Sequence, residues 1–319
     1  MRLLRVTVTV AIGLSLACGC QSAPVEPVVL TKGETGASKI GATFPNDKAS
    51  LKFAVIGDFG SGTAGQYQTA ARMAETHSTF PFEIVLTVGD NLYGSQRRQD
   101  FVTKFEVPYK LLLDAKVKFY ASLGNHDIRD QRNYEHFNMG GELYYTFKAP
   151  RQNVKFFVLE TTYPEPEQIK WVEEELKSST EDWKIAYFHH PLYSSGGRHG
   201  SDEQLRDSLE PLFIKYGVSV VFNGHDHLYE RTKPQQGITY FVTGSGGMLR
   251  PGGFRPNLPF SAKINASTMV FFVAEILDDK MHFKAISREG TLVDEGEITR
   301  RGATPVVGVP ALGAKEPIR

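Results

Sequence analysis

Short apolar runs separated by helical patterns dominate the middle of this 319-residue sequence, and this alternation restricts the possible folds more than any other feature. Apolar runs of this length are typical of buried strands. Their alternation with helical patterns predicts β-α-β units and a mainly parallel sheet. The apolar runs are residues 51–57, 82–88, 117–123, 154–160, 183–188 and 218–222.

Three helical patterns lie between these runs. In the second pattern, Ile169, Val172 and Leu176 repeat at the spacing of one helix face. In the third, Ser201 is a candidate N-cap and Gly217 is a candidate terminator. The three patterns cover residues 64–77, 166–179 and 201–217.

The pattern changes after residue 237, where helical periodicity stops and strand-like runs follow at short intervals. Such a series predicts an antiparallel meander that closes a second sheet. The expected fold class is therefore α/β, with two packed mixed β-sheets flanked by helices. The late runs are residues 238–244, 269–277, 280–287 and 292–299.

The two ends of the sequence differ in composition from the part between them. Arg2 and Arg5 precede about twelve mostly apolar residues, which is too few to span a membrane and typical of a signal peptide. Segments rich in Pro, Gly, Ser and Thr are typical of flexible linkers. The expected division is a signal peptide at 1–20, a flexible linker at 21–50, a folded domain at 51–299 and a flexible tail at 300–319.

Both cysteines, Cys18 and Cys20, lie at the end of the signal-like segment, so the folded domain contains no disulfide. A run of small residues that ends in cysteine resembles a bacterial lipoprotein cleavage site. It predicts an exported protein of the periplasm or cell envelope with a lipid anchor to the membrane. The alternative is cleavage without lipidation near Ala17 or Ala23.

The net charge of the sequence is balanced, with 36 basic and 36 acidic side chains. Nucleic acid binding usually shows as a basic patch and a high isoelectric point. The composition therefore argues against a nucleic acid as a stable partner.

Five of the apolar runs end in unusual polar residues. In open α/β sheets, ligands bind outside the carboxyl ends of the strands, so we expect these five ends to belong to one sheet and to converge. His225 and His227 strengthen this expectation, because alternate residues of an extended segment project to the same side. The five segments are GDFG at 57–60, GDNLY at 89–93, GNHD at 124–127, HHP at 189–191 and GHDH at 224–227.

Each of these segments is a weak signal when taken alone, because Gly and Asp are common in turns. Together they supply two carboxylates, an amide oxygen, a phenol and imidazoles. Burying such a cluster costs too much desolvation for it to serve packing alone. Mixed oxygen and imidazole ligands suit iron, zinc or manganese, so the sequence predicts a metal site.

In this order, the five segments resemble the five-block signature of the calcineurin-like metallophosphoesterases. Most members of that superfamily carry Asp-x-His in the first block. This sequence has Asp58-Phe59-Gly60 there and Tyr93 in the second block, as in the purple acid phosphatases. The resemblance covers residues 51 to about 230 and implies a four-layer α/β/β/α sandwich. It implies the small type with one catalytic domain, because the preceding linker is too short for the extra N-terminal domain of the large plant enzymes.

The resemblance also implies a dinuclear metal centre, with one ferric ion and one divalent ion (Fe²⁺, Zn²⁺ or Mn²⁺) bridged by Asp90. His189 is preferred over His190 as a ligand, because the family's ligand lies two residues before the proline. The ligands implied for the ferric ion are Asp58, Asp90, Tyr93 and His227. Those implied for the divalent ion are Asp90, Asn125, His189 and His225.

Three further residues have implied roles near the phosphate. His126 matches the substrate-facing histidine of the third block, and Asp127 is expected to orient a ligand or His126. His199 lies where some members place a second phosphate-facing histidine, although histidines in such loops are also often simply exposed. The fourth strand ends in Leu159-Glu160 where the family often has Leu-Asp, a departure that touches no expected ligand.

The implied activity is hydrolysis of small-molecule phosphate monoesters by a metal-activated hydroxide, as in an acid phosphatase. A phosphodiesterase on the same scaffold is an alternative that the ligand set does not exclude, because loop shape decides the substrate. A surface protein that binds metal or phosphate without turnover is a second alternative, and His126 argues against it. The Gly-rich stretch 243–253 follows a strand and is not assigned to the site.

Overall fold

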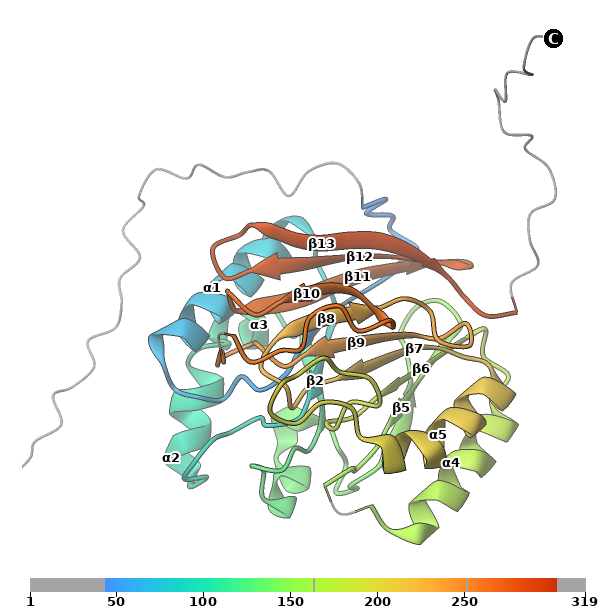
Figure 1. The fold of residues 1–319 in the computed structure, drawn as a ribbon. Coiled ribbons are helices and arrows are strands. Elements are labelled where there is room, and N and C mark those ends of the chain that lie inside the picture. The colour runs from blue at the N-terminus through green and yellow to red at the C-terminus, as the bar shows by residue number, and fades with distance from the viewer. Residues whose placement is uncertain (1–43, 163, 251, 303–319) are drawn as a thin grey trace, which may run out of the picture. The chain divides into compact units, whose positions relative to one another are not determined.

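The computed structural model describes residues 44–302 except residues 163 and 251, and these residues form two β-sheets with helices on their outer faces (Figure 1). The six strands of the first sheet are β1 (Leu51–Ile56), β2 (Ile84–Val88), β3 (Lys118–Ser122), β11 (Val270–Leu277), β12 (Lys280–Ser287) and β13 (Leu292–Thr299). Their order is β13-β12-β11-β1-β2-β3. β1, β2 and β3 run parallel, and the antiparallel meander β11-β12-β13 joins them through β1.

The seven strands of the second sheet are β4 (Tyr145–Lys148), β5 (Val154–Val158), β6 (Trp183–Tyr187), β7 (Val218–Asn223), β8 (Tyr229–Thr232), β9 (Thr239–Thr243) and β10 (Ser261–Asn265). Their order is β10-β8-β9-β7-β6-β5-β4. The central strands β5, β6, β7 and β9 are parallel, and the outer strands pair antiparallel. Both sheets are therefore mixed.

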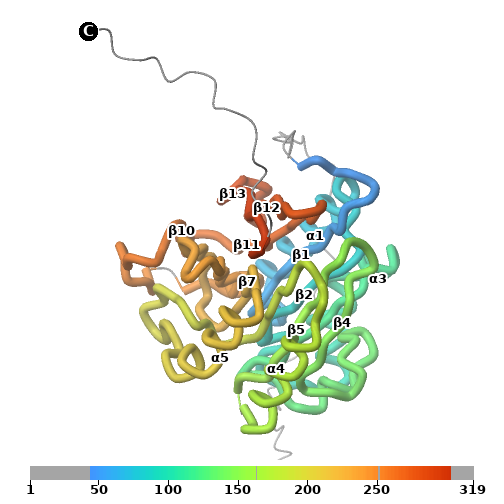
Figure 2. The backbone as a smooth tube through the Cα atoms, turned by 90° about the vertical axis from the view of Figure 1, so that its right-hand side faces the viewer, coloured from blue at the N-terminus to red at the C-terminus, as the bar shows by residue number. Residues whose placement is uncertain are grey.

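The helices cover the two sheets from opposite sides, as Figures 1 and 2 show. The first sheet is covered by α1 (Ala64–Thr79), α2 (Arg98–Phe101), the π-helical turn Val102–Glu106 and α3 (Lys110–Asp114). The second sheet is covered by α4 (Pro166–Ser178) and α5 (Glu203–Tyr216). Short 3₁₀ turns at Arg129–Asn133 and Glu135–Phe137 follow β3. The predicted four-layer α/β/β/α sandwich is confirmed.

Alternate side chains of one strand pack into different hydrophobic cores. In β1, Phe53 and Val55 face the core between the two sheets, while Ala54 and Ile56 face the core under α1. Side chains at i and i+2 share a face of a strand, so a strand covered on both sides must be apolar throughout. This explains why the sequence shows continuous apolar runs and not alternation.

Three details of the fold differ from the sequence predictions. The run 238–244 does not belong to the meander, because β9 pairs parallel with β7 inside the second sheet. Asp202, and not Ser201, caps α5, since its side chain accepts the Leu205 N–H at 2.9 Å. Strands β4, β8 and β10 were not predicted. Gly217 ends α5 as expected, with a φ of 80°.

The packed region begins before Leu51. The backbone N–H groups of Asn46 and Asp47 donate to the buried Glu275 carboxylate at 2.7 Å, and the Ser50 hydroxyl donates to it at 2.6 Å. These bonds tie the last residues of the expected linker to β11.

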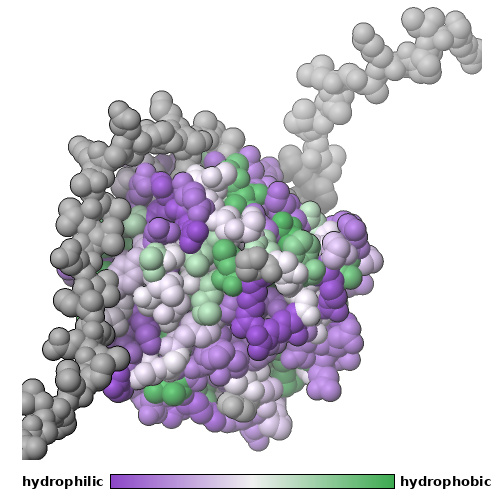
Figure 3. All heavy atoms as spheres, turned by 60° about the vertical axis from the view of Figure 1, so that its left-hand side comes forward, coloured by the Kyte–Doolittle hydropathy of each residue, from purple (hydrophilic) through white to green (hydrophobic). Residues whose placement is uncertain are grey.

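The expected signal peptide, with Cys18 and Cys20, lies outside the described residues, as do most of the linker and the tail. Within the described ranges, no helix combines the length and the apolar composition needed to cross a membrane. On the face shown in Figure 3, the described hydrophobic residues form small groups among hydrophilic ones.

Candidate active site

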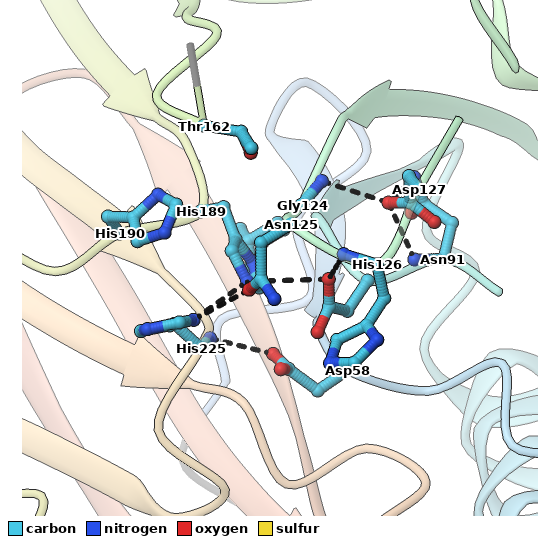
Figure 4. Close-up of polar contacts among 12 residues, drawn as sticks. Asp58, Asn91, Gly124, Asn125, His126, Asp127, Thr162, His189, His190 and His225 are labelled. Atoms are coloured by element: carbon cyan, nitrogen blue, oxygen red, sulfur yellow. Dashed lines mark hydrogen bonds and ion pairs between the residues drawn. The ribbon is translucent and has the colours of Figure 1, made fainter. Parts of the chain in front are cut away.

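The polar segments that follow five strands meet at one place, where the carboxyl ends of strands from both sheets lie together (Figure 4). Asp58, Asp90 and Asn125 follow β1, β2 and β3 of the first sheet. His189 and His225 follow β6 and β7 of the second sheet. The convergence of the five ends is confirmed, but the expectation that they belong to one sheet is wrong.

The backbone at these strand ends adopts conformations that few residues accept. Asp58, Asp90 and His225 have φ values of 54°, 49° and 70°. Asp and His are among the non-glycine residues that enter this left-handed region most readily. A Cβ atom at Gly124 would collide with Asp90, and one at Gly224 would crowd the Asp58 carboxylate. The glycines therefore let neighbouring segments approach closely enough to form the site.

One group of polar side chains forms around Tyr93. Its hydroxyl lies 3.1 Å from Oδ1 of Asp58 and 3.0 Å from Nε2 of His227. The same His227 nitrogen lies 3.4 Å from Oδ1 of Asp58. We call Asp58, Tyr93 and His227 the tyrosine group.

A second group forms around Asn125, as Figure 4 shows. Its Oδ1 atom lies 3.0 Å from Nε2 of His189 and 2.9 Å from Nδ1 of His225, and these two nitrogens are 3.1 Å apart. Nδ1 of His189 lies 2.9 Å from the Val88 carbonyl, which only accepts, so Nδ1 carries the proton and Nε2 presents a lone pair. We call Asn125, His189 and His225 the asparagine group.

Asp90 lies between the two groups. Its Oδ1 atom is 3.4 Å from Nε2 of His189 in the asparagine group. Asp90, Asp58 and His227 also offer ligand atoms that all lie within 4.8 Å of one another. The backbone N–H of His126 donates to Asp90 at 2.9 Å and fixes the carboxylate.

The charges and lone pairs of the site suit a bound cation. Burial and then the Asp90 carboxylate raise the pKa of Asp58 well above its usual range, and burial also raises the pKa of Asp90. Burial lowers the pKa of His189 and of His225, so both imidazoles are neutral. Crowded carboxylates, neutral imidazoles and an amide oxygen are ligands for iron, zinc or manganese. The residues present therefore fit a pair of metal ions.

The sequence model that describes the calcineurin-like phosphoesterases matches residues 51–229. This range includes both groups and Asp90. The chain belongs to this family.

The chain is also similar in sequence to acid phosphatases within this family. The chain is 28% identical over 243 residues to tartrate-resistant acid phosphatase type 5 of Homo sapiens, and the match covers 63% of this chain and 74% of the relative. It is 27% identical over 242 residues to purple acid phosphatase 17 of Arabidopsis thaliana, covering 65% and 71%. The predicted resemblance to the purple acid phosphatases is confirmed by these sequence relationships.

A solved structure shows the same fold. Purple acid phosphatase PPD1 from yellow lupin seeds superposes with a TM-score of 0.65 at 19% identity, covering 86% of this chain and 58% of the lupin chain. The shared fold is the two-sheet sandwich with flanking helices.

The histidines expected near the phosphate surround the opening of this phosphoesterase site. His126 is exposed, and its ring lies 4.8 Å from that of Tyr93. His199 is also exposed, with its ring 4.0 Å from that of His225. His190 lies next to the asparagine group but does not belong to it, as expected. Its Nδ1 atom lies 3.0 Å from the Thr161 hydroxyl.

Asp127 holds together the segments that carry Asp90 and Asn125. Its carboxylate accepts the backbone N–H groups of Asn91 and Leu92 at 3.0 Å and that of Gly124 at 2.9 Å. These bonds agree with a role in positioning the predicted ligands, which stays a prediction, and no bond from the Asp127 carboxylate to the His126 ring occurs among the described residues.

Sequence reasoning missed Asp226, which lies between His225 and His227. Its buried carboxylate accepts the Ser194 hydroxyl at 2.6 Å and the Gly200 N–H at 3.0 Å. It thus anchors residues 194–200, which include His199, to the segment that carries two predicted ligands. No pattern in the sequence indicates that these two segments meet.

The Gly-rich stretch 243–253 was left outside the predicted site, yet it borders it. The N–H of Gly246 donates to the Gly57 carbonyl at 3.0 Å, and that of Gly247 donates to the Asp58 carbonyl at 3.1 Å. Burial and then the Arg250 guanidinium lower the pKa of His227 to about 4. The stretch therefore holds the backbone of Asp58 in place and brings the positive charge of Arg250 toward the tyrosine group.

Proposed function

We propose that this protein is an acid phosphatase that hydrolyses phosphate monoesters at a dinuclear metal centre. One observation carries the proposal: two groups of ligand atoms, three side chains each, face one another across the shared Asp90. The sequence relationship to acid phosphatases supports the choice of reaction.

The proposed centre holds a ferric ion in the tyrosine group and a divalent ion (Fe²⁺, Zn²⁺ or Mn²⁺) in the asparagine group. A pair of ions of this kind neutralises phosphate charge and lowers the pKa of bound water, which supplies a nucleophile at acidic to neutral pH. The ferric ligands in this proposal are Asp58, Asp90, Tyr93 and His227. The ligands of the divalent ion are Asp90, Asn125, His189 and His225.

The remaining residues act on the ester. His126 stands exposed beside Tyr93 and either stabilises the phosphoryl oxygens or gives a proton to the leaving oxygen. His199, beside the His225 ring, contacts the phosphoryl oxygens from the opposite loop. The His189–Val88 bond keeps the lone pair of Nε2 directed into the site, which fixes the ligand before any ion binds.

The proposal is tested by metal analysis combined with an assay panel. The protein should release phosphate from monoesters much faster than from diesters, and faster at acidic than at neutral pH. Faster cleavage of diesters would favour the phosphodiesterase alternative. Stoichiometric metal with no hydrolysis of either ester class would favour a protein that only binds metal or phosphate.

The identity of the ferric ion is tested through Tyr93. A phenolate bound to ferric iron absorbs visible light, so the pure protein should be violet or purple. The variant Tyr93→Phe keeps the ring and should lose the colour without losing the fold. Two equivalents of zinc or manganese without iron in the native protein would contradict the ferric assignment.

We further propose that the protein is exported and lipid-anchored at Cys18 or Cys20. Replacement of both cysteines by alanine should then release the protein from the membrane fraction. A wild-type protein that is already in the soluble fraction and carries no lipid mass would contradict the anchor.

A further inference from the structure

A pocket of about 900 Å³ opens directly beside the proposed metal centre. His199 and His225 line one wall, so the pocket and the centre share a boundary. The other walls come from the start of α5 and from the segment around Arg255 and Phe260. A phosphate held at the centre would therefore direct its organic portion into this pocket.

Three arginines line the pocket, and they differ in how they are paired. Arg206 is engaged, since its guanidinium lies 3.5 Å from the Glu203 carboxylate and over the Tyr193 ring. Arg198 and Arg255 have no acidic partner within 4 Å among the described residues. These two cations are thus available to an anion from solution.

The lining contains fewer acidic than basic side chains. Glu203 pairs with Arg206, and Asp202, whose carboxylate also accepts the Leu205 N–H, is the other lining carboxylate. With three arginines against two carboxylates, the lining keeps an excess of positive charge next to the phosphate site.

The backbone fixes where Arg255 lies. Its N–H donates to the Ser195 carbonyl at 2.7 Å, and its guanidinium donates to the Gly196 carbonyl at 3.3 Å. Gly200 adopts a φ of 80°, and a Cβ atom there would collide with the Arg255 guanidinium. Because Asp226 anchors the same loop, Arg198 and Arg255 stand on a wall that is held to the ligand segment.

Part of the lining is apolar. Leu258 and Phe260 contribute to it, and the Phe260 ring packs 5.4 Å from that of Tyr193. A carbon skeleton fits against these side chains while an anionic group faces the arginines.

We propose that this pocket binds the leaving portion of the substrate, and that Arg198 and Arg255 select phosphate esters carrying a second anionic group on that portion. This inference rests on the proposed phosphatase function and names its substrate class: organic phosphates with an additional carboxylate or phosphate. Arginine pairs with either group through charge-assisted hydrogen bonds.

The test is a binding comparison that does not depend on turnover. Two non-hydrolysable phosphonates serve as probes for the metal-loaded protein: 4-carboxybenzylphosphonate and its neutral isostere 4-carbamoylbenzylphosphonate. Calorimetry should show about tenfold or tighter binding of the carboxylate probe, the usual effect of one hydrogen bond between charged groups. Equal affinity of the two probes would overturn the inference.

Variants assign the preference to the two arginines. The double variant Arg198→Gln/Arg255→Gln should bind both probes with equal affinity. The matched control is Arg151→Gln. It removes an exposed arginine that pairs with Glu83 and is not among the pocket-lining residues, so this variant should keep the preference. A preference that persists in the double variant would overturn the inference.

The same samples separate this inference from the proposed function. Hydrolysis of phenyl phosphate by a protein that binds both probes equally would support the phosphatase and reject the anion-selective pocket. A clear probe preference without hydrolysis of any monoester would support the pocket and reject the phosphatase.

Discussion

The ligand cluster and the pocket wall lie side by side but are built in different ways. The proposed ligands follow buried strands, and bonds such as His225 N–H to Asp58 and His126 N–H to Asp90 hold the segments in place. The pocket wall is carried by two loops that pair with each other through Gly197 and Gly253, and Asp226 ties one of them to the segment of His225 and His227. The proposed chemistry thus depends on strand ends, and the proposed selection depends on side chains carried by loops, which tolerate substitution more readily. Changes in the first region should abolish turnover, and changes in the second should alter which substrate is preferred.

Asp90→Asn should produce the largest effect. It removes the one charged ligand common to both proposed ions, so metal content should fall at both positions and turnover should disappear. Elemental analysis and an assay at saturating substrate check this. The Tm of the metal-free variant should not fall, because burial already disfavours a charged Asp90 and raises its pKa. Full metal content with normal turnover would show that Asp90 is not shared.

His126→Ala should leave both metals bound and reduce kcat by about 10²–10⁴-fold, the usual contribution of an acid–base group. The side chain is exposed, so the fold should not change. Steady-state kinetics with metal analysis on the same sample checks this. His136→Ala, a partly exposed histidine of a 3₁₀ turn, is the control. Near-normal kcat in His126→Ala would remove its catalytic role.

Asp226→Asn tests the junction between the two regions. The Ser194 hydroxyl and the Gly200 N–H both donate to Oδ2 of Asp226. An asparagine offers these two donors a neutral oxygen in place of a charged one, so the bonds weaken and residues 194–200 should loosen. Turnover should fall by about 10–100-fold, as for other residues that support ligands. Metal content should stay unchanged, and the preference for the carboxylate probe should weaken. Loss of metal instead would assign Asp226 to the ligand cluster.

Glu275→Gln should have the smallest effect on activity. This buried carboxylate accepts hydrogen bonds from Asn46, Asp47 and Ser50. It lies beside the start of β1, at the opposite end of this strand from the site. Replacing it should cost about 1–3 kcal/mol of unfolding free energy, the usual cost of an impaired buried hydrogen-bonding group. Denaturant unfolding measures the loss, and kcat should stay at the wild-type value. A large change in kcat would show that the two ends of β1 are coupled.

Much of the ligand cluster could be predicted because its signal is local. A glycine followed by a polar residue at the end of a buried strand marks Asp58, Asp90 and Asn125 within a few letters of sequence. The assignment of strands to sheets could not be predicted in the same way. Strands covered on both faces are apolar throughout, so β9 looks the same whether it pairs with β7 or joins the meander.

The pocket wall was missed because its contacts join segments far apart in sequence. Nothing near Asp226 indicates that its carboxylate meets Ser194 and Gly200. Likewise, the Gly-rich stretch 243–253 looks like an ordinary loop until Gly246 and Gly247 are seen to bond the Gly57–Asp58 backbone. The N-cap of α5 is a smaller example of the same limit. The Ser201 hydroxyl accepts the Ser194 backbone N–H, and the Asp202 carboxylate caps the helix.

The position of the ligands on both sheets has a consequence for how the protein matures. Each proposed ion draws on Asp90 from the first sheet and on at least one histidine from the second, so neither half of the sandwich holds a complete set of ligands. We expect the complete centre to form only after the sheets dock, and bound metal would add its binding free energy to that docking. The compartment in which the chain first becomes compact thus decides which metals it meets, and the architecture links cofactor choice to the place of folding.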